Sequence, residues 1–133
     1  MWPVPEPGDI VWCRFPERPR DVPGPKPRPA LVLEVSQYED GHLLKVAYGT
    51  SKKVNQLMAG EFAICKLTNP LGYQLAGLAL DTKFDLRTVV EIPWDELFFA
   101  VPPRPEHGQH PKLGVLHPSL VKVVASALRA ISK

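Results

Sequence analysis

The sequence predicts a mainly β fold, in which a small antiparallel β barrel carries one C-terminal α-helix. Short segments rich in β-branched and aromatic residues recur along the 133 residues, and prolines, glycines or turn signals separate them. One of these segments is almost continuously apolar, and only the C-terminal segment repeats its apolar residues at helical spacing. These three observations favour short strands wrapped around one core and followed by a helix.

The first strand is expected at residues 10–15, which are β-branched and aromatic and are followed by a proline. Residues 30–35 form a nearly continuous apolar run, which indicates a strand buried on both of its faces. Asp40-Gly41 is a turn signal, and it predicts a hairpin that returns along residues 43–48. Three further strands are expected at residues 61–65, 80–84 and 88–92.

The helix is expected after Pro118, because proline is favoured in the first turn of a helix. Residues 102–111 are interpreted as a loop before it, since prolines cluster there. The segment ends with Arg129 and Lys133, whose charges suit the C-terminal end of a helix dipole. Its apolar residues lie three or four positions apart and are Leu120, Val124, Ala127, Leu128 and Ile131.

Composition and charge bound the class of protein. With 44% hydrophobic residues and a net charge of +2, the chain is expected to form a single domain over residues 1–133. No apolar stretch reaches the ~20 residues that a membrane-spanning helix needs, and the N-terminus lacks a signal-peptide pattern, so a cytoplasmic location is expected. Cys13 and Cys65 match no metal or disulfide spacing and are interpreted as small buried apolar residues.

A long, proline-rich loop at residues 16–29 separates the first two strands. Hairpin loops usually take about 2 to 5 residues, and longer ones often cover binding sites. Basic residues on a stiff backbone suit phosphate contact, although a solvated surface loop fits the composition equally well. The local charge is +3, from Arg14, Arg18, Arg20, Lys26 and Arg28 against Glu17 and Asp21.

Arg28 differs from the other basic residues of this loop, because it directly precedes the buried strand at residues 30–35. A backbone anchored by the core holds a guanidinium in a fixed geometry toward two phosphate oxygens. The alternative interpretation is an ion pair at the end of the strand, with a carboxylate of Glu34, Asp81 or Asp85.

The strand at residues 43–48 ends in a polar, basic turn. A glycine permits close backbone approach, and the hydroxyls and lysines that follow suit a phosphate, although they are also ordinary turn residues. If the hairpin pairs as predicted, the start of its first strand lies beside the end of its second, so that Arg28 and Thr50 meet on one rim. The turn contains Gly49, Thr50, Ser51, Lys52 and Lys53.

These segments resemble the MazF/PemK family of toxin ribonucleases from bacterial toxin–antitoxin modules, and the resemblance covers most of the chain. The main motifs are Pro7-Gly8-Asp9-Ile10-Val11-Trp12, Arg28-Pro29-Ala30-Leu31-Val32-Leu33 and Tyr48-Gly49-Thr50-Ser51. A PemK-type branch is also similar in the closing helix and in Ala76-Gly77-Leu78 with Thr82-Lys83-Phe84-Asp85-Leu86.

The resemblance implies an SH3-like barrel of the MazF/CcdB type that forms a homodimer and cleaves single-stranded RNA, such as mRNA, without a metal or other cofactor. It also implies a cognate antitoxin that lies in the RNA groove. Arg28 and Thr50 match the family's catalytic arginine and threonine, and residues 16–27 match its loop over the site. The residues then expected to bind substrate are Arg14, Arg18, Arg20, Lys26, Ser51, Lys52 and Lys53.

Metal-free cleavage of RNA uses the substrate's own 2′-hydroxyl to attack the adjacent phosphorus, and it leaves a cyclic phosphate and a free 5′-hydroxyl. Arg28 suits the stabilisation of the added negative charge, and the hydroxyl of Thr50 can donate a hydrogen bond to a non-bridging oxygen. Arginine has a pKa above ~12, which makes it a poor base at neutral pH, so the general base and acid are not assigned.

Histidines and aromatic residues offer two further interpretations. The histidines in the C-terminal third fit no strong zinc spacing and are interpreted as loop residues rather than metal ligands. Aromatic rings can stack on bases, although Trp12, on the first strand, is expected in the core. The residues considered are His107, His110 and His117 for metal, and Trp12, Trp94, Phe98 and Phe99 for stacking.

Two other functions remain open from the sequence. CcdB-like toxins resemble MazF in fold but bind a topoisomerase instead of cutting RNA, and a degenerate relative retains only RNA or antitoxin binding. Arg28 and Thr50 favour the ribonuclease. An acidic, partly disordered antitoxin segment also fits the basic rim by charge. Residues 112–133 carry four basic and no acidic residues, which either widen that surface or solvate one helix face.

Overall fold

The computed structural model describes residues 2–17, 22–104 and 108–132. Its strands form a single six-stranded antiparallel sheet in the order β4-β5-β3-β2-β1-β6. The elements are β1 (Asp9–Cys13), β2 (Arg28–Tyr38), β3 (Gly41–Thr50), β4 (Glu61–Ile64), α1 (Pro70–Leu75), β5 (Thr82–Pro93), β6 (Lys112–Val115), the 3₁₀ turn η2 (Pro118–Leu120) and α2 (Val121–Ile131).

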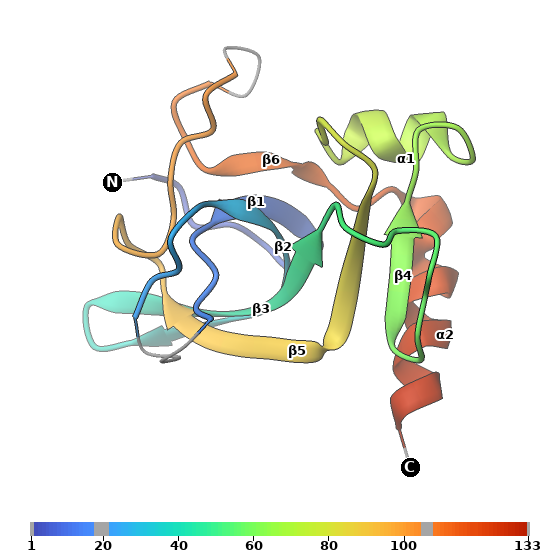
Figure 1. Ribbon diagram of the computed structural model, residues 1–133. Helices are drawn as coiled ribbons and strands as arrows, with labels where there is room; N and C mark the ends of the chain where they lie inside the picture. The colour runs from blue at the N-terminus through green and yellow to red at the C-terminus, as the bar shows by residue number, and fades with distance from the viewer. Residues whose placement is uncertain (1, 18–21, 105–107, 133) are drawn as a thin grey trace.

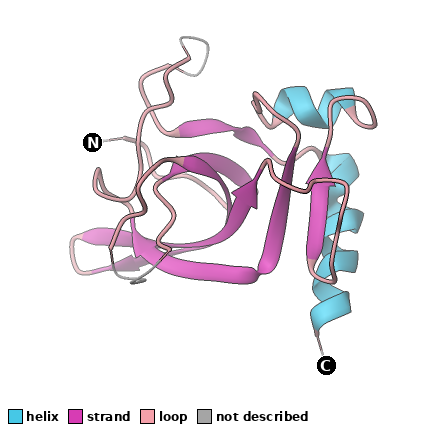
Figure 2. Ribbon diagram, in the orientation of Figure 1, coloured by secondary structure: helices cyan, strands magenta, loops and turns pink. Residues whose placement is uncertain are grey.

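The sheet coils strongly, and its edge strands are β4 and β6 (Figure 1). No ladder joins these two edges within the described part of the chain, so the barrel is open. Both helices gather at one end of the sheet, and the long connections from β1 to β2 and from β5 to β6 lie largely at the other end (Figure 2). The predicted mainly β antiparallel fold with a C-terminal helix is thus confirmed, as a coiled sheet that is not closed into a barrel.

Strand β2 separates two hydrophobic clusters, because successive side chains of a strand point to opposite faces. Ala30 and Val32 enter one cluster, together with Val11 from β1, whereas Leu31 enters the other. All four side chains are almost fully buried. This confirms the predicted strand at residues 30–35, with burial on both faces over residues 30–32, whereas Glu34 is exposed.

Strand β5 joins the two strands that were predicted separately at residues 80–84 and 88–92. Its second half pairs with the start of β3, where Ala47 faces Val89, but the next residue, Tyr48, faces Asp85. The residues between them form a bulge, which bends the strand and lets its first half pair with β4 as well. The bulge therefore explains why the sequence pattern is interrupted within one continuous strand.

Helix α1 and strand β6 were missed by the sequence analysis, because both are too short to show a period. The signal for α1 was present locally, since Asn69 accepts a hydrogen bond from the backbone N–H of Gly72 at 2.9 Å and a proline follows it. Strand β6 pairs with β1 and packs closely against the end of α1. A Cβ at Gly114 would lie 2.1 Å from the carbonyl oxygen of Leu75.

Helix α2 packs on the cluster formed by the other face of the sheet. Leu120 and Ala127 are buried there, and Val124 and Ile131 are partly buried against the same cluster. Leu128, which the pattern also placed on the apolar face, is 42% exposed. The predicted helix is therefore confirmed, with a buried face narrower than its sequence suggests.

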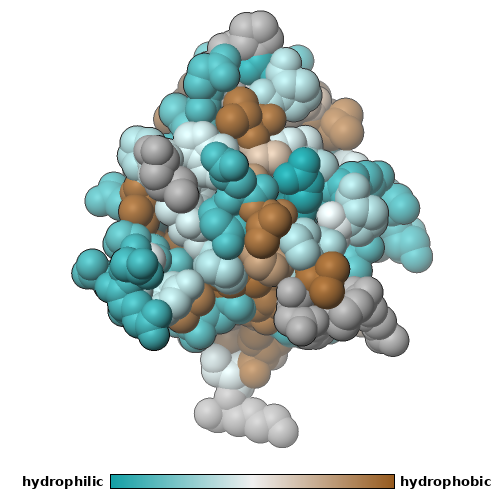
Figure 3. Space-filling model, turned by 90° about the vertical axis from the view of Figure 1, so that its left-hand side faces the viewer, coloured by the Kyte–Doolittle hydropathy of each residue, from teal (hydrophilic) through white to brown (hydrophobic). Residues whose placement is uncertain are grey.

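The surface and the cysteines add little to the site. The face shown in Figure 3 is mixed, with scattered hydrophobic patches among predominantly hydrophilic side chains. Among the described residues, none of the helices combines the length and the apolar character needed to cross a membrane. Cys13 and Cys65 are both free thiols, and burial raises the pKa of the Cys13 thiol well above its ordinary value. Cys65 is only partly buried, in contrast to the prediction.

Candidate functional site

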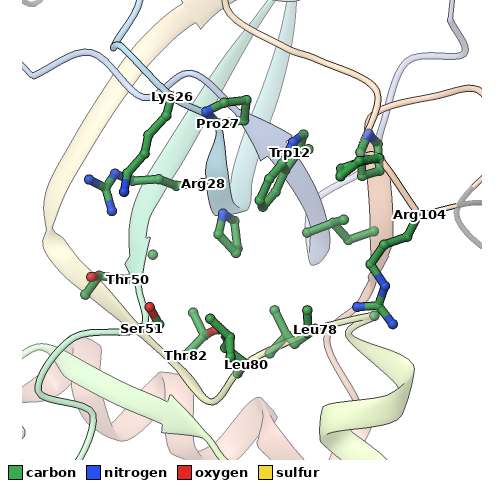
Figure 4. A pocket seen from close by; sticks show the side chains of 17 residues that line it. Trp12, Lys26, Pro27, Arg28, Thr50, Ser51, Leu78, Leu80, Thr82 and Arg104 are labelled. Atoms are coloured by element: carbon green, nitrogen blue, oxygen red, sulfur yellow. Dashed lines mark hydrogen bonds between the residues drawn. The ribbon is translucent and has the colours of Figure 1, made fainter.

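The pairing of β2 with β3 brings Arg28 and Thr50 to the same end of these two strands. Ala30 faces Tyr48 in this ladder, and Arg28 and Thr50 each lie two residues farther toward that end. The backbones approach closely here, because a Cβ on Gly49 would lie 2.3 Å from the carbonyl oxygen of Pro29. Figure 4 shows both side chains at the rim of one cavity, which is the juxtaposition that the predicted hairpin required.

The guanidinium of Arg28 is held between a carboxylate and an aromatic ring. Its Nη2 atom lies 3.6 Å from Oε1 of Glu17, and its Cζ atom lies 5.6 Å from the ring centroid of Tyr48. The side chain of Arg28 is 17% exposed, whereas that of Glu17 is 47% exposed. An ion pair this long and this open to solvent contributes little stability, so an incoming phosphate can compete for Arg28.

The predicted alternative, a strand-end ion pair of Arg28, is correct in kind but wrong in partner. Glu34 pairs instead with Lys45 at 2.7 Å, and Asp85 pairs with Arg87 at 3.1 Å. The partner of Arg28 is instead Glu17, which belongs to the long loop between β1 and β2.

The hydroxyl of Thr50 lies at the same end of these strands as Arg28. Its Oγ1 atom accepts a hydrogen bond from the backbone N–H of Lys52 at 3.2 Å. This contact orients the oxygen and leaves the hydroxyl proton able to donate to a ligand. Thr50 is the last residue of β3 and is half-buried, so its backbone is fixed by the sheet while its side chain remains accessible.

The cavity beside these two residues has a volume of about 280 Å³ and two cationic ends, and we call it the basic cavity. Lys26 and Arg28 lie at one end, and Arg104 lies on the opposite side (Figure 4). Between them the wall is largely apolar. The side chains that define the cavity are Trp12, Lys26, Arg28, Thr50, Ser51, Leu78, Leu80 and Arg104.

The prediction that placed Trp12 in the core is wrong. Trp12 is half-buried and points into the basic cavity, because its neighbours on β1, Val11 and Cys13, turn toward the core (Figure 4). The other three aromatic candidates for stacking are buried in a hydrophobic cluster, and they are Trp94, Phe98 and Phe99. Of the four rings considered, Trp12 is therefore the one that borders the basic cavity.

A second cavity, of about 250 Å³, lies on the other side of Thr50, and we call it the acidic cavity. Thr50 borders both cavities, since it also lines this one. The carboxylates of Glu17, Glu61 and Asp85 supply the charge of the acidic cavity, and the remaining walls are Phe15, Pro16, Tyr48 and Thr88.

The carboxylate of Asp85 is held in its ionised form. Burial raises its pKa, but hydrogen bonds from the side chain and backbone of Arg87 and from the hydroxyl of Thr88 outweigh burial, and the net pKa lies below its ordinary value. The Thr88 hydroxyl donates at 2.9 Å and the Arg87 backbone N–H at 2.9 Å. Asp85 therefore carries its charge at neutral pH, with most of its lone pairs already engaged.

Glu61 forms a buried ion pair with Lys83, which faces Thr50 across the ladder between β3 and β5. The Nζ atom of Lys83 lies 3.1 Å from Oε1 of Glu61 and donates to the carbonyl oxygen of Gln56 at 3.2 Å. Both side chains are at most 10% exposed. This pair fixes the floor under Thr50, because separating two buried charges is costly.

The remaining predicted substrate-binding residues divide into two groups. Lys26 and Ser51 line the basic cavity. The described walls of the two cavities include neither Arg14 nor Lys52 nor Lys53, and the two lysines lie exposed on the turn after β3. The predictions for Arg18 and Arg20 fall outside the described residues.

The histidines take structural positions where the structure describes them. His117 caps η2, since its Nδ1 atom accepts a hydrogen bond from the backbone N–H of Ser119 at 3.0 Å. His110 lies beside Pro111 and Trp94 in a different cavity. His107 is outside the described residues. Among the described residues, histidines, cysteines and carboxylates form no group of three that could hold a metal ion.

Several residues of the site were missed by the sequence analysis as site residues. Glu17 was counted only as a charge of the loop, and Arg104 was counted only within a proline-rich segment. Leu78 and Leu80 lie far from Arg28 in the chain, and only the folding of the segment between α1 and β5 brings them to the same cavity. A loop residue has no periodicity, so the sequence offered no signal for these contacts.

A family of known proteins matches almost the whole chain. A family model described as "PemK-like, MazF-like toxin of type II toxin-antitoxin system" matches residues 6–132. The chain therefore belongs to this family of toxins, and the resemblance seen in the strand motifs is confirmed. A search of curated proteins finds no match.

Proposed function

We propose that this protein is a metal-independent endoribonuclease toxin that cleaves single-stranded RNA by attack of the 2′-hydroxyl, and that a cognate antitoxin neutralises it. The proposed substrate in the cell is mRNA, which sets the site of action in the cytoplasm, and the proposed assembly is a homodimer. Membership of the toxin family supports the toxin class and an antitoxin partner. The geometry around Arg28 and Thr50 supports the chemistry.

The observation that carries the proposal is the position of Arg28 and Thr50 at one rim of the basic cavity. A guanidinium and a hydroxyl on neighbouring strands present fixed donors to the same anionic group. Lys26 and Ser51 add charge and a further hydroxyl to this rim. Such a set of donors suits a phosphate whose negative charge increases in the transition state.

The roles follow from the chemistry of the two side chains. Arg28 contacts the non-bridging oxygens and stabilises the charge that develops on phosphorus, and Thr50 donates a hydrogen bond to one of them. Their backbones are fixed by the ends of β2 and β3, so little reorganisation accompanies the reaction. The 2′-hydroxyl oxygen then attacks phosphorus and gives its proton to a general base. The bond between phosphorus and the 5′-oxygen breaks, and this oxygen takes a proton from solvent water as it leaves.

We assign the general base to Glu17. Asp85 and Glu61 are engaged by strong internal partners, whereas Glu17 has an exposed side chain and lines the acidic cavity together with Thr50. When a phosphate takes over Arg28, the carboxylate of Glu17 is released from its ion pair beside the substrate. It is then placed to accept the proton of the attacking hydroxyl.

The antitoxin is expected to present acidic residues to the basic cavity. The cationic groups at its two ends, Lys26 and Arg28 on one side and Arg104 on the other, match a segment with carboxylates spaced along it. A disordered segment that orders on binding can follow such a surface over its whole length. Competition with RNA is then direct, because both ligands need Arg28.

The test is cleavage of a long single-stranded RNA by the purified protein in the presence of a chelator. Cuts at defined positions that leave cyclic phosphate and 5′-hydroxyl ends support the proposal. The matched variants are Arg28→Ala and Arg129→Ala, since Arg129 lies in the last turn of α2 and loses the same charge away from the cavities. Activity is expected to disappear in the first variant and to persist in the second.

Two results contradict the proposal. Intact RNA with both the wild-type protein and the Arg129→Ala variant would leave a binding protein, either of the CcdB type or restricted to RNA and antitoxin. Cleavage that survives in Arg28→Ala would place the reaction elsewhere or identify a contaminating nuclease. Mapping the RNA ends in the same experiment supplies the cleavage sequence.

A further inference from the structure

Trp12 lies between the two cationic ends of the basic cavity (Figure 4). We propose that its indole ring is the stacking platform for the base of a nucleotide next to the scissile phosphate, and that Arg104 contacts the phosphate on the far side of that base. This inference rests on the proposed function and adds a specificity subsite to it. It assigns the basic cavity to one nucleotide of a single strand.

The backbone of Trp12 is fixed on three sides. It pairs with Pro29 in the ladder between β1 and β2, next to the pair of Cys13 with Arg28. Its N–H donates to the carbonyl oxygen of Pro111 at 2.8 Å, and its own carbonyl oxygen accepts from the N–H of Ala100 at 3.1 Å. A ring on such a backbone forms a rigid surface at a fixed position relative to Arg28.

The wall opposite Trp12 is apolar. Leu78 and Leu80 line it, and Leu80 is 63% exposed although it is a leucine at the mouth of a cavity (Figure 4). An indole on one side and leucines on the other form a slot that suits a flat, weakly polar ring. Base stacking on aromatic side chains is the usual way in which proteins hold single-stranded nucleic acids.

Arg104 completes the cavity at the end opposite Arg28 (Figure 4). Arg104 also borders a third cavity, which adjoins the basic cavity and is lined by Lys66 and Tyr73; Leu78 lines both of these adjoining cavities. From Arg28 the basic cavity therefore offers a cation, an aromatic ring and a second cation, and the adjoining cavity adds a lysine and a tyrosine. A cation, a ring and a cation match the phosphate, base and phosphate of one nucleotide step.

The face of a base is accessible to an indole only when the nucleotide is unstacked, so the subsite selects single strands. An acidic protein segment also fits the two cations. It has no need of the exposed ring, however, unless an aromatic residue lies between its carboxylates. The arrangement of Trp12 with its leucine wall favours RNA over protein as the ligand of this cavity.

The first experiment needs no variant that risks misfolding. The cleavage step is mapped, and RNA oligonucleotides that contain it are made with an abasic residue at each neighbouring position in turn. We expect one abasic position to raise KM about tenfold with little change in kcat, in line with the loss of one stacked base. If no position raises KM by more than about twofold, the subsite is wrong and the proposed function stands.

The second experiment couples that position to Trp12. With the intact oligonucleotide, Trp12→Leu is expected to raise KM about tenfold, whereas Trp12→Phe, which keeps a ring, changes it by about threefold or less. With the abasic oligonucleotide, Trp12→Leu is expected to have no further effect, because the ring has lost its partner. Equal losses on both oligonucleotides would indicate a merely structural role and would overturn the proposal.

A third measurement is independent of cleavage. Titration with short single-stranded RNA, carrying a 2′-deoxy residue at the cleaved step, is expected to quench tryptophan fluorescence in the wild type but not in Trp12→Phe. If the wild type cleaves no RNA, random-sequence oligonucleotides replace the mapped one. Quenching that depends on Trp12 then supports the subsite while the proposed function fails, and unchanged fluorescence overturns the subsite.

Arg104 is tested by salt dependence. Loss of one contact to a single-strand phosphate is expected to reduce the slope of log K against log salt by about 0.7. Arg104→Gln should show this change, and Arg129→Gln, which removes the same charge from α2, should retain the wild-type slope. Identical slopes in the two variants would remove Arg104 from the subsite.

Discussion

The basic cavity and the acidic cavity meet at Thr50, but they differ in charge and in how firmly their ionic groups are held. In the acidic cavity, Asp85 and Glu61 are fixed by internal hydrogen bonds and ion pairs. At the rim of the basic cavity, Arg28 lies against the ring of Tyr48, and its ion pair among the described residues is a long contact to an exposed carboxylate. Asp85 and Glu61 therefore have firm partners within the protein, whereas Arg28 can exchange its contact with Glu17 for a contact with a ligand.

This difference indicates where the substrate enters. Removing one partner of the buried pair between Glu61 and Lys83 would destabilise the fold, because it would leave an uncompensated buried charge. The contact between Arg28 and Glu17 contributes little, and it is the contact that a phosphate replaces. The five predictions that follow test the contrast between the two cavities; the first four are in order of decreasing effect on activity, and the fifth concerns stability.

Loss of Arg28 is expected to have the largest effect. Arg28→Ala should lower kcat/KM for RNA by about 10³-fold or more, because it removes a charged donor to the developing negative charge. Arg28→Lys keeps the charge but loses the two-pronged geometry, and it should recover only part of the activity. Circular dichroism and thermal unfolding are expected to match the wild type, and wild-type turnover by a folded Arg28→Ala protein would exclude the assigned role.

Glu17→Gln distinguishes two roles of this carboxylate: a general base, or merely an ion-pair partner that competes with phosphate for Arg28. As general base, Glu17 is expected to contribute about 10² to 10³-fold to kcat, because it accepts the proton of the attacking hydroxyl. Glu34→Gln is the matched control, since Glu34 pairs with Lys45 on the surface. If kcat stays constant or rises in Glu17→Gln, the carboxylate only competes with phosphate for Arg28.

Thr50 is expected to contribute less than either ionic group. Thr50→Val keeps the shape of the side chain and removes its hydrogen bond to the phosphate oxygen, so kcat should fall by about 10²-fold. Thr50→Ser restores the hydroxyl and should recover most of the rate. Single-turnover cleavage measures both variants, and equal rates for valine and serine would remove the hydroxyl from the mechanism.

The smallest effects are expected at the turn after β3. Lys52 and Lys53 were predicted to bind substrate, but both are exposed and lie outside the described walls of both cavities, where salt weakens the interactions of a charge. Lys53→Ala should therefore change kcat/KM by about threefold or less at physiological salt. A loss comparable to that of Thr50→Val would show that RNA extends over this turn.

The acidic cavity also predicts a dependence of stability on pH. Because the folded pKa of Asp85 lies below its ordinary value of 3.8, its charge stabilises the fold fully above that value, and this stability is lost as the pH falls further. Asp85→Asn should flatten the decrease in unfolding free energy with falling pH in this acid range. Urea unfolding at a series of pH values measures it, and parallel curves for the two proteins would contradict the prediction.

Much of the fold could be predicted because local patterns and core burial agree along the chain. The apolar run after Arg28, the Asp40-Gly41 turn and the C-terminal helical period each indicated an element that the structure contains. Helix α1 and strand β6 could not be predicted in this way, because elements this short are stabilised by what packs on them and have no period of their own.

The candidate site could be predicted only in part. The hairpin register sufficed to place Arg28 beside Thr50, since the turn fixes which residues face each other. The role of Trp12 depends on which face of β1 is covered, and that follows from the packing of distant segments. Its prediction failed for this reason, since an aromatic residue on a strand is ordinarily buried.

The strand and helix pattern, the family of the protein and the position of Arg28 and Thr50 at one end of the β2–β3 ladder could be predicted from the amino-acid sequence. These depend on neighbours in the chain and on one short turn. Three further features required the three-dimensional structure. Glu17 contacts Arg28, and Arg104 lies across the cavity from Arg28. Trp12 faces a cavity, whereas Trp94 is buried. Those contacts join segments separated by tens of residues, and their energies arise only when the sheet coils and its loops pack against it.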